Sequence, residues 1–323
     1  MKFSYTINNK LMMNSNGKLI CVDPYNPLNL PLGTIRVRTN DGQTPVSGHW
    51  NYVTLVEGTT DVYDVFAGGD EFLYTLEGAT NVIDVLGVNG EGKIHSNGMF
   101  MGCTSLSSVP SFDTTKITNM DSMFEGCSSL TDAPYLDTSN VTHMWKVFKD
   151  CDSLTSVPLY DTSKVTSAGG FEESFMNCSS LTSVPLFNLS NTDFLTRTFY
   201  GCTSLVSVPK FDITNVESMH STFENCTSLT TIPLFDTSNL RYMDETFQNC
   251  TSLTSIPLFD TSNLVGIDYA FENCVNVQSG ALALYQQAST QSVVPHHTHT
   301  FMNCGINTQT GSAELAQIPS DWK

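Results

Sequence analysis

The sequence predicts an α/β repeat solenoid, with a short strand and a short helix or 3₁₀ turn in each coil, between a small N-terminal β domain and a C-terminal cap. Nine cysteines recur at a spacing that is most often 24 residues, and the third residue before each is phenylalanine. Apolar residues also recur three, six and nine positions after most of them. A position that stays apolar in every copy is one that every coil buries. The cysteines of this column are Cys103, Cys127, Cys151, Cys178, Cys202, Cys226, Cys250, Cys274 and Cys304.

Residues 1–75 do not repeat, and we predict that they form a small β-rich domain or cap. Apolar residues alternate around Tyr5 and again at Ile35 and Val37, and a β-branched run covers 52–56. Prolines and an Asn-Asp-Gly turn separate these segments, as in short strands joined by turns. Whether this region is an independent module or only a cap stays open.

Residues 76–280 form the predicted solenoid, in which positions are counted from each column cysteine. The segment from +3 to a proline at +7 is short and β-branched, which predicts a brief strand. An Asp-Thr-Ser turn follows. In the best copy the apolar residues Val141, Met144 and Phe148 then have helical spacing behind Ser139 as N-cap, which predicts a short helix or 3₁₀ turn.

Both ends of the solenoid depart from the repeat. Ala79 lies 24 residues before Cys103 and marks a degenerate first coil, reached through a segment with helical spacing at 70–76. After the Cys274 coil, residues 280–287 predict a helix in place of the strand, and the register returns once more at Cys304. We assign residues 281–323 to a C-terminal cap, because an end coil has a neighbour on one side only.

The charge balance and the motifs exclude several classes of function. Acidic residues outnumber basic ones 32 to 14, for a formal net charge of −18. Such a surface repels phosphate backbones and anionic lipids, so neither nucleic acid nor a membrane is an expected partner. No nucleophile motif, zinc pair, phosphate loop or dinucleotide fingerprint occurs. We predict a protein that is not an enzyme, with no catalytic residues and no cofactor.

Three residue groups allow a structural and a chemical interpretation. The column cysteines could form disulfides between coils. Because the same position is alanine at Ala79, we favour reduced cysteines that only pack in the core. Cys21 lies outside the column and is a candidate reactive thiol. The repeated aspartates could bind calcium or form Asx turns, and the turn is favoured. His296, His297 and His299 are weak candidates for a metal site, and a solvated loop is favoured.

The candidate binding residues are those where the chain departs from its own repeat. Position +8 changes character between coils and is predicted to face outward, and an insertion around Gly169 interrupts the middle of the solenoid. An exposed apolar stripe is typical of a binding face, although packing under a neighbouring subunit would also explain it. Position +8 is Ser111 in the first full copy, and the candidate binding residues at +8 are Tyr135, Leu159, Leu186, Lys210, Leu234 and Leu258.

The repeated unit resembles the BspA-like leucine-rich-repeat surface proteins. The run from Met123-Phe124 through Cys127 and Asp137-Thr-Ser to Met144 shows the motif best, and the resemblance covers about residues 76–304. It implies a leucine-rich-repeat-like solenoid with a role in adhesion and surface recognition, in bacteria, protists or bacteriophages, and no catalytic residues.

These observations lead to a functional hypothesis with two alternatives. The first residues lack the apolar core of a signal peptide and no stretch could span a bilayer, so we expect a virion or extracellular surface location reached by another path, such as a phage particle. We predict a surface recognition and adhesion protein, part of an oligomer or assembly, which binds a cell-surface protein or glycan or other virion proteins. The alternatives are a structural or decoration protein of a virion and a bacterial cell-surface adhesin.

Overall fold

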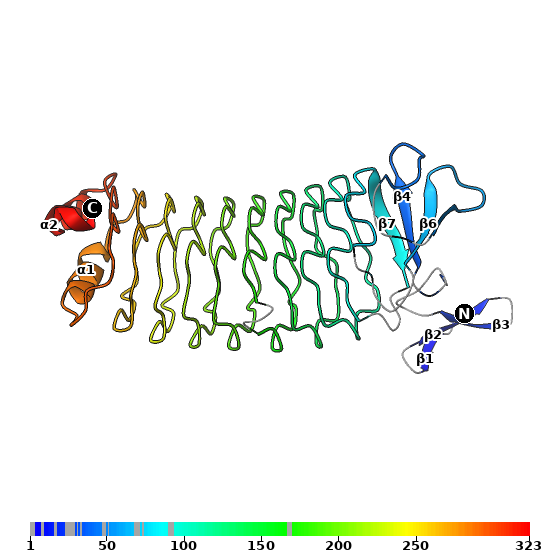
Figure 1. Cartoon of the computed structure of the whole chain (residues 1–323), viewed down its shortest axis with the longest axis horizontal. Helices are drawn as coiled ribbons and strands as arrows, with labels where there is room; N and C mark the ends of the chain where they lie inside the picture. The colour runs from blue at the N-terminus through cyan, green and yellow to red at the C-terminus, as the bar shows by residue number, and fades with distance from the viewer. Residues whose placement is uncertain are drawn as a thin grey trace.

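Figure 1 shows the computed structural model of the chain, in which successive coils lie side by side along the longest axis. Two β-sheets lie at the N-terminal end and two helices at the C-terminal end (Figure 1). The structure describes residues 4–7, 10–15, 18–22, 30, 32, 34–46, 50, 52–67, 72, 74–89, 94–166 and 170–323.

The N-terminal region contains two antiparallel sheets. The first has the order β1-β2-β3, from strands Ser4–Ile7, Lys10–Ser15 and Lys18–Val22. The second has the order β5-β6-β4-β7. Its strands are β4 (Thr34–Thr39), β5 (Tyr52–Leu55), β6 (Val62–Phe66) and β7 (Val82–Val88).

Strands predicted around Tyr5, Ile35 and Tyr52 are confirmed as β1, β4 and β5, whereas β2, β3 and β6 were not predicted. Strand β7 belongs to the degenerate first coil, yet it pairs with β4 along its length. The sheet therefore extends across the boundary placed at residue 75. The helical spacing at 70–76 does not give a helix where the chain is described, because Tyr74 has a φ of 51° and lies in a turn.

Neither the short strand nor the short helix predicted for each coil is present in the described coils, 94–166 and 170–280. Each coil is a succession of hydrogen-bonded turns, and coils meet at isolated parallel bridges such as Asp132 with Ser156. Asp137, and not Ser139, accepts the local hydrogen bond. The repeat-solenoid architecture is observed, but its local structure differs from the prediction.

The turns have a backbone cause. In the Cys127 coil, φ is 54° at Ser122 and 75° at Gly126. Two left-handed residues four positions apart interrupt any helix in this segment. The amide of Cys127 donates to the carbonyl of Phe124 at 3.0 Å, which closes a turn with Gly126 at the position that a type II turn reserves for positive φ.

Phenylalanine rings form a continuous stack through the core. The ring of each coil lies over that of the next, with centroid distances between 5.2 Å for Phe124–Phe148 and 5.9 Å for Phe271–Phe301. The stack ends on Trp322, whose ring is stacked 6.2 Å from that of Phe301. All these rings are buried, and so are the residues at +3, +6 and +9 in the coils from Cys103 to Cys250, apart from the partly buried Ala133, which confirms the predicted inward columns.

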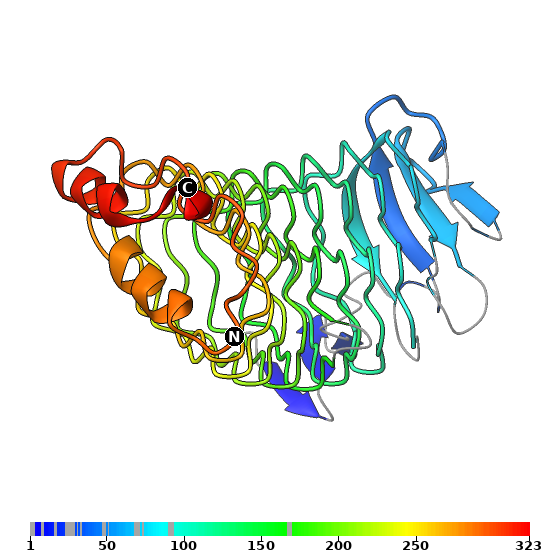
Figure 2. The ribbon, with the colours of Figure 1, turned by 60° about the vertical axis from the view of Figure 1, so that its left-hand side comes forward.

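The C-terminal cap covers the open end of the last coil. Helix α1 (Ala281–Ser289) confirms the helix predicted at 280–287, and α2 (Gln309–Gln317) and the 3₁₀ turn η1 (Ser320–Trp322) follow it. The two helices lie side by side at that end (Figure 2). Gly280 begins α1 with a φ of 102°, and a Cβ there would lie 2.1 Å from the carbonyl oxygen of Ile256. Only glycine fits this junction.

Candidate functional site

The structure places the residues at position +8 on the outside of the solenoid, where we call them the outer stripe. Each follows the proline at +7 and lies between inward-facing residues at +6 and +9. Lys210 is also exposed, and Gly169 lies outside the described residues. The exposed fractions of the apolar members are 70% for Tyr135, 64% for Leu159, 58% for Leu186, 54% for Leu234 and 57% for Leu258.

The column cysteines are buried and free, and the eight from Cys103 to Cys274 donate hydrogen bonds. Each thiol from Cys103 to Cys274 donates a hydrogen bond of 3.0 to 3.1 Å to a backbone carbonyl of the preceding coil. The acceptor lies three residues before the column residue of that coil, as Phe100 does for the thiol of Cys127. Our prediction from size alone was therefore incomplete, because the column also supplies a donor that alanine lacks. Burial raises the pKa of Cys103 and Cys304 to about 12, which removes the thiolate needed for reactivity. The side chain of Cys21 lies outside the described part.

The repeated aspartates form the predicted Asx turns. The Oδ1 atom of Asp137 accepts the amide of Ser139 at 3.0 Å, and Asn188 replaces aspartate with the same bond to Ser190 at 3.1 Å. Hydrogen bonds from Ser163 lower the pKa of Asp161. The same bond is made at Asp113, Asp161, Asp212, Asp236 and Asp260.

Two of the three candidate histidines, which lie within the C-terminal cap, make ring contacts. The ring of His297 stacks on Trp322 at 4.1 Å, and its Nδ1 lies 2.7 Å from the carbonyl oxygen of Pro295. His299 packs edge-on against Tyr269. Within the described ranges, no three His, Cys, Asp or Glu side chains are grouped to hold a metal ion.

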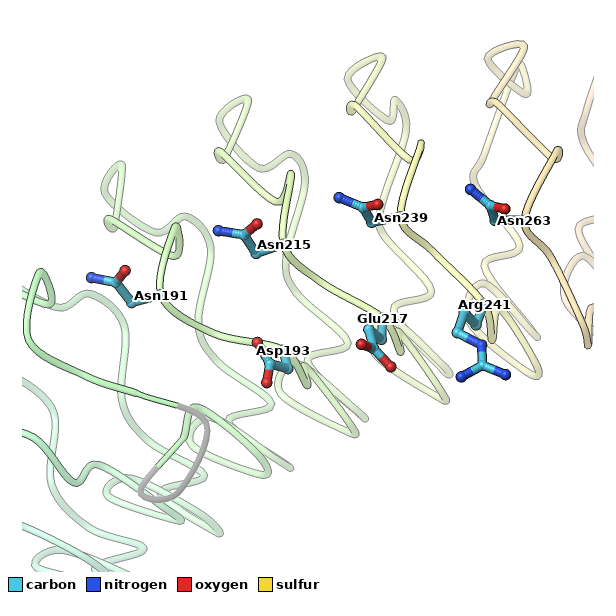
Figure 3. A pocket seen from close by; sticks show the side chains of 7 residues that line it. All are labelled: Asn191, Asp193, Asn215, Glu217, Asn239, Arg241 and Asn263. Carbon is cyan, nitrogen blue, oxygen red and sulfur yellow. The ribbon is translucent and has the colours of Figure 1, made fainter.

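A polar groove runs across successive coils on the side of the solenoid that follows the Asx turns (Figure 3). It has a volume of about 640 Å³. One wall is a row of asparagines at position +13, and the other carries charged side chains at +15. The lining residues, which define the polar groove, are Asn191, Asn215, Asn239, Asn263, Asp193, Glu217 and Arg241.

The asparagine row has a fixed orientation. The Nδ2 atom of Asn215 donates to the carbonyl of Ser190 in the preceding coil at 2.7 Å, and Asn239 does the same to Thr214 at 2.6 Å. Figure 3 shows the four carboxamides in the same pose, with each nitrogen turned toward the preceding coil. The result is a row of amide oxygens, all oriented alike, which can accept hydrogen bonds.

The residue type at position +15 changes where the charged wall begins. Position +15 is Thr118 and Thr142 in earlier coils, and becomes Asp193, Glu217 and Arg241 only along the groove. We did not predict the groove from the sequence. This change at an outward position, beside a repeated asparagine, is the signal that could have revealed it.

A second hollow continues the groove toward the cap. It has a volume of about 490 Å³, shares Asn263 with the groove, and is lined in part by Val265, Val293 and Val294. The polar groove therefore ends against a more apolar surface near α1.

Comparison with known proteins assigns the repeats to a family. Residues 95–207 and 170–285 match the family described as "Mycoplasma protein of unknown function, DUF285", and these two ranges together cover more than half of the chain. The chain belongs to this family. The family's description names no ligand and no phage. A search of curated proteins found no match.

Two crystal structures of leucine-rich repeat proteins are similar to the chain. One, from Bacteroides ovatus, is 16% identical over 84% of this chain and 89% of the other, with a TM-score of 0.35. The other, from Eubacterium ventriosum, is 13% identical over 68% of this chain and 85% of the other, with a TM-score of 0.28. At these values the likeness supports no conclusion about ligands. Where the chain is described, its helices are too short or too polar to cross a membrane.

Proposed function

We propose that the chain is a non-catalytic recognition module that binds a protein partner through the outer stripe. The observation that carries the proposal is the exposure of five large apolar side chains, each more than half exposed, at one position of the repeat. Exposed apolar side chains that recur on successive coils in this way, here with Lys210 between Leu186 and Leu234, are typical of protein interaction sites. The resemblance to BspA-like surface proteins agrees with such a role, whereas the family description states no function.

The charges around the outer stripe indicate the chemistry of the partner. The aspartates at position +10 lie two residues from the stripe, and Asp212, Asp236 and Asp260 are exposed. With a net charge of −18, two copies of this chain repel each other. We therefore favour a different protein, whose apolar ridge is bordered by lysine or arginine, over a second copy. A phage particle as carrier, virion decoration and cell-surface adhesion all stay predictions.

Site-specific cross-linking tests the proposal. Leu159 is replaced by a photoreactive benzoylphenylalanine, and the control carries the same group at Ser156, which is exposed in the same coil but at position +5. We expect one protein of the target surface to cross-link at 159 only, and to be lost when Tyr135 and Leu186 are changed to serine. Cross-linking to a second copy of the chain, or equal cross-linking at both positions, would overturn the proposal.

A further inference from the structure

We infer that the polar groove binds an extended, uncharged glycan chain, with about one sugar ring per coil. This inference goes beyond the proposed protein-binding role and does not depend on it, since the polar groove and the outer stripe have no residue in common. Three properties of the groove support it: its repeat distance, its set of hydrogen-bonding groups and its near balance of charge.

The repeat distance matches a linear polymer. Along the charged wall, the amide of Glu217 donates to the carbonyl of Asp193 at 2.8 Å, and that of Arg241 to the carbonyl of Glu217 at 2.8 Å. Such bonds place neighbouring coils at the usual strand spacing of about 4.8 Å. A pyranose ring in an extended chain advances by a similar distance. Successive rings can therefore meet successive asparagines in equivalent positions.

The hydrogen-bonding groups fit hydroxyls. Four asparagine oxygens and the carboxylates of Asp193 and Glu217 accept hydrogen bonds, and the guanidinium of Arg241 donates. A sugar hydroxyl both donates and accepts, so it can pair with either kind of group. Because the asparagine amides are already held by backbone carbonyls, they need no rearrangement on binding, which lowers the entropy that the complex loses.

The charges of the groove argue against charged polymers. Asp193 and Glu217, within a chain of net charge −18, disfavour a polyanion. Arg241 in the same wall disfavours a basic peptide, which would have to bury its own charges beside a guanidinium. An uncharged hydroxyl-rich chain meets neither penalty.

Two exposed aromatic residues follow residues of the charged wall in the sequence. Phe194 and Tyr242 directly follow Asp193 and Arg241, and they are 39% and 38% exposed. The guanidinium of Arg241 lies 5.7 Å from the centre of the Tyr242 ring. These two rings are two coils apart, or about 10 Å at the strand spacing. That is close to the length of a disaccharide unit, so the apolar faces of alternate sugars can pack on them.

Residues found at positions +13 and +15 in other coils provide substitutions that should leave the fold intact. Glu217→Thr with Arg241→Thr installs the residue present in the same position at Thr118 and Thr142. Asn239→Lys copies Lys164, which occupies the asparagine position of an earlier coil and donates to Asn140 at 2.7 Å. A lysine at 239 fills the polar groove without changing the backbone.

The test begins with an array of neutral linear glycans and continues by calorimetry with the hexasaccharide that binds. We expect the hexasaccharide to bind at least tenfold more tightly than its disaccharide, because it spans more coils. Glu217→Thr/Arg241→Thr and Asn239→Lys should each weaken binding at least tenfold. A control with the same charge changes outside the groove, Glu57→Thr/Lys116→Thr, should bind normally; both control residues are exposed.

Three outcomes would overturn the inference: no glycan of the array binds, binding does not depend on length, or the groove variants bind as the unchanged chain does. Binding of hexalysine in place of a glycan, sensitive to Glu217→Thr/Arg241→Thr, would show that the groove is a site for basic peptides. None of these outcomes affects the outer stripe, whose own test uses different residues.

Discussion

The N-terminal sheet and the solenoid both bring extended backbone together at strand spacing, but different interactions stabilise them. In the sheet, β6 pairs with β4 along the whole length of β6, and Arg36 donates two hydrogen bonds of 2.7 and 2.8 Å to Asp64. In the solenoid, bridges between coils are isolated, and the same buried rings and thiols repeat from coil to coil. The sheet relies on specific pairs and the solenoid on columns.

This difference sets how a single change is transmitted. In a solenoid, stability is approximately a sum of coil terms and nearest-neighbour terms, so a column residue contributes to the contacts with both of its neighbours. A side-chain pair in the sheet affects chiefly the strands that carry it. Changes to columns should therefore be large and cooperative, and changes to pairs small and local.

The largest effect that we predict is alkaline unfolding driven by the cysteine column. Burial raises the pKa of each column thiol, so the folded chain keeps protons that the unfolded chain releases above about pH 8.5. The stabilising contribution is present below that pH and is lost as pH rises toward the folded pKa. We expect the free energy of unfolding to fall by about 1.4 kcal/mol per pH unit for each thiol. Urea denaturation between about pH 8 and pH 11 measures this slope.

The control for this prediction is Cys226→Ser. Serine keeps a donor for the carbonyl of Phe199, which Cys226 contacts at 3.1 Å, but does not titrate in this range. The slope of the free energy of unfolding against pH should decrease by the contribution of one thiol. The free energy of unfolding near neutral pH should change little. A stability that stays constant up to about pH 10.5, or a slope unchanged in the serine variant, would contradict the column model.

Removing one ring from the phenylalanine stack should have the next largest effect. Phe223 is buried, with its ring 5.4 Å from both Phe199 and Phe247, so Phe223→Ala leaves a cavity between two neighbours. We expect a loss of about 3 to 5 kcal/mol in the free energy of unfolding, measured by urea denaturation. A loss below about 1 kcal/mol would mean that the stack can close around the gap.

Repetition explains why the solenoid could be predicted and its turns could not. The phenylalanine, cysteine and leucine columns identify themselves because the chain repeats them. The left-handed positions divide into two kinds. The residue before each cysteine is always Gly, Asn or Asp, as Gly126 and Asn225 are, and this was an available signal. The second left-handed position, at Lys146, Glu173 and Arg197, is occupied by no characteristic residue type, so the sequence gives no signal for it. The hydrogen bonds between coils impose its positive φ.

The N-terminal sheet and the polar groove lacked this advantage. Strand β6 has no second copy to support it, and its pairing with β4 depends on residues far apart in the chain. The groove lies at outward positions, where burial does not constrain the residue type. The outer stripe was predictable because large apolar side chains at an outward position are unusual.

A local effect of intermediate size should follow from breaking the Arg36–Asp64 pair. The two side chains are about a quarter exposed, and the hydrogen bond to Asp64 raises the pKa of Arg36. Asp64→Asn should destabilise the sheet by about 1 to 2 kcal/mol, because a charge-assisted pair is lost. Hydrogen exchange should show faster opening of β4 and β6 and unchanged coils. Faster exchange in the coils as well would make the sheet and the solenoid one cooperative unit.

Asp61→Asn is the matched control for that change. Asp61 lies 3.6 Å from Arg38, and both side chains are 42% exposed. Exposed pairs of this kind contribute about 0 to 1 kcal/mol, so exchange in β4 and β6 should change little. An equal effect of the two substitutions would show that general charge balance, and not the paired geometry, stabilises the sheet.

The smallest effect should come from the outward threonines at position +4, which recur in most coils, with Ser107 and Val206 among the exceptions. Thr230 donates to the carbonyl of Val206 at 3.2 Å at the solvent-exposed surface, and water can replace that bond. Thr230→Ala should therefore cost under about 0.5 kcal/mol, against several for Phe223→Ala in the same coil. Urea denaturation of both variants under one condition makes the comparison. Equal losses would mean that regular repetition alone, and not burial, decides which columns stabilise the solenoid.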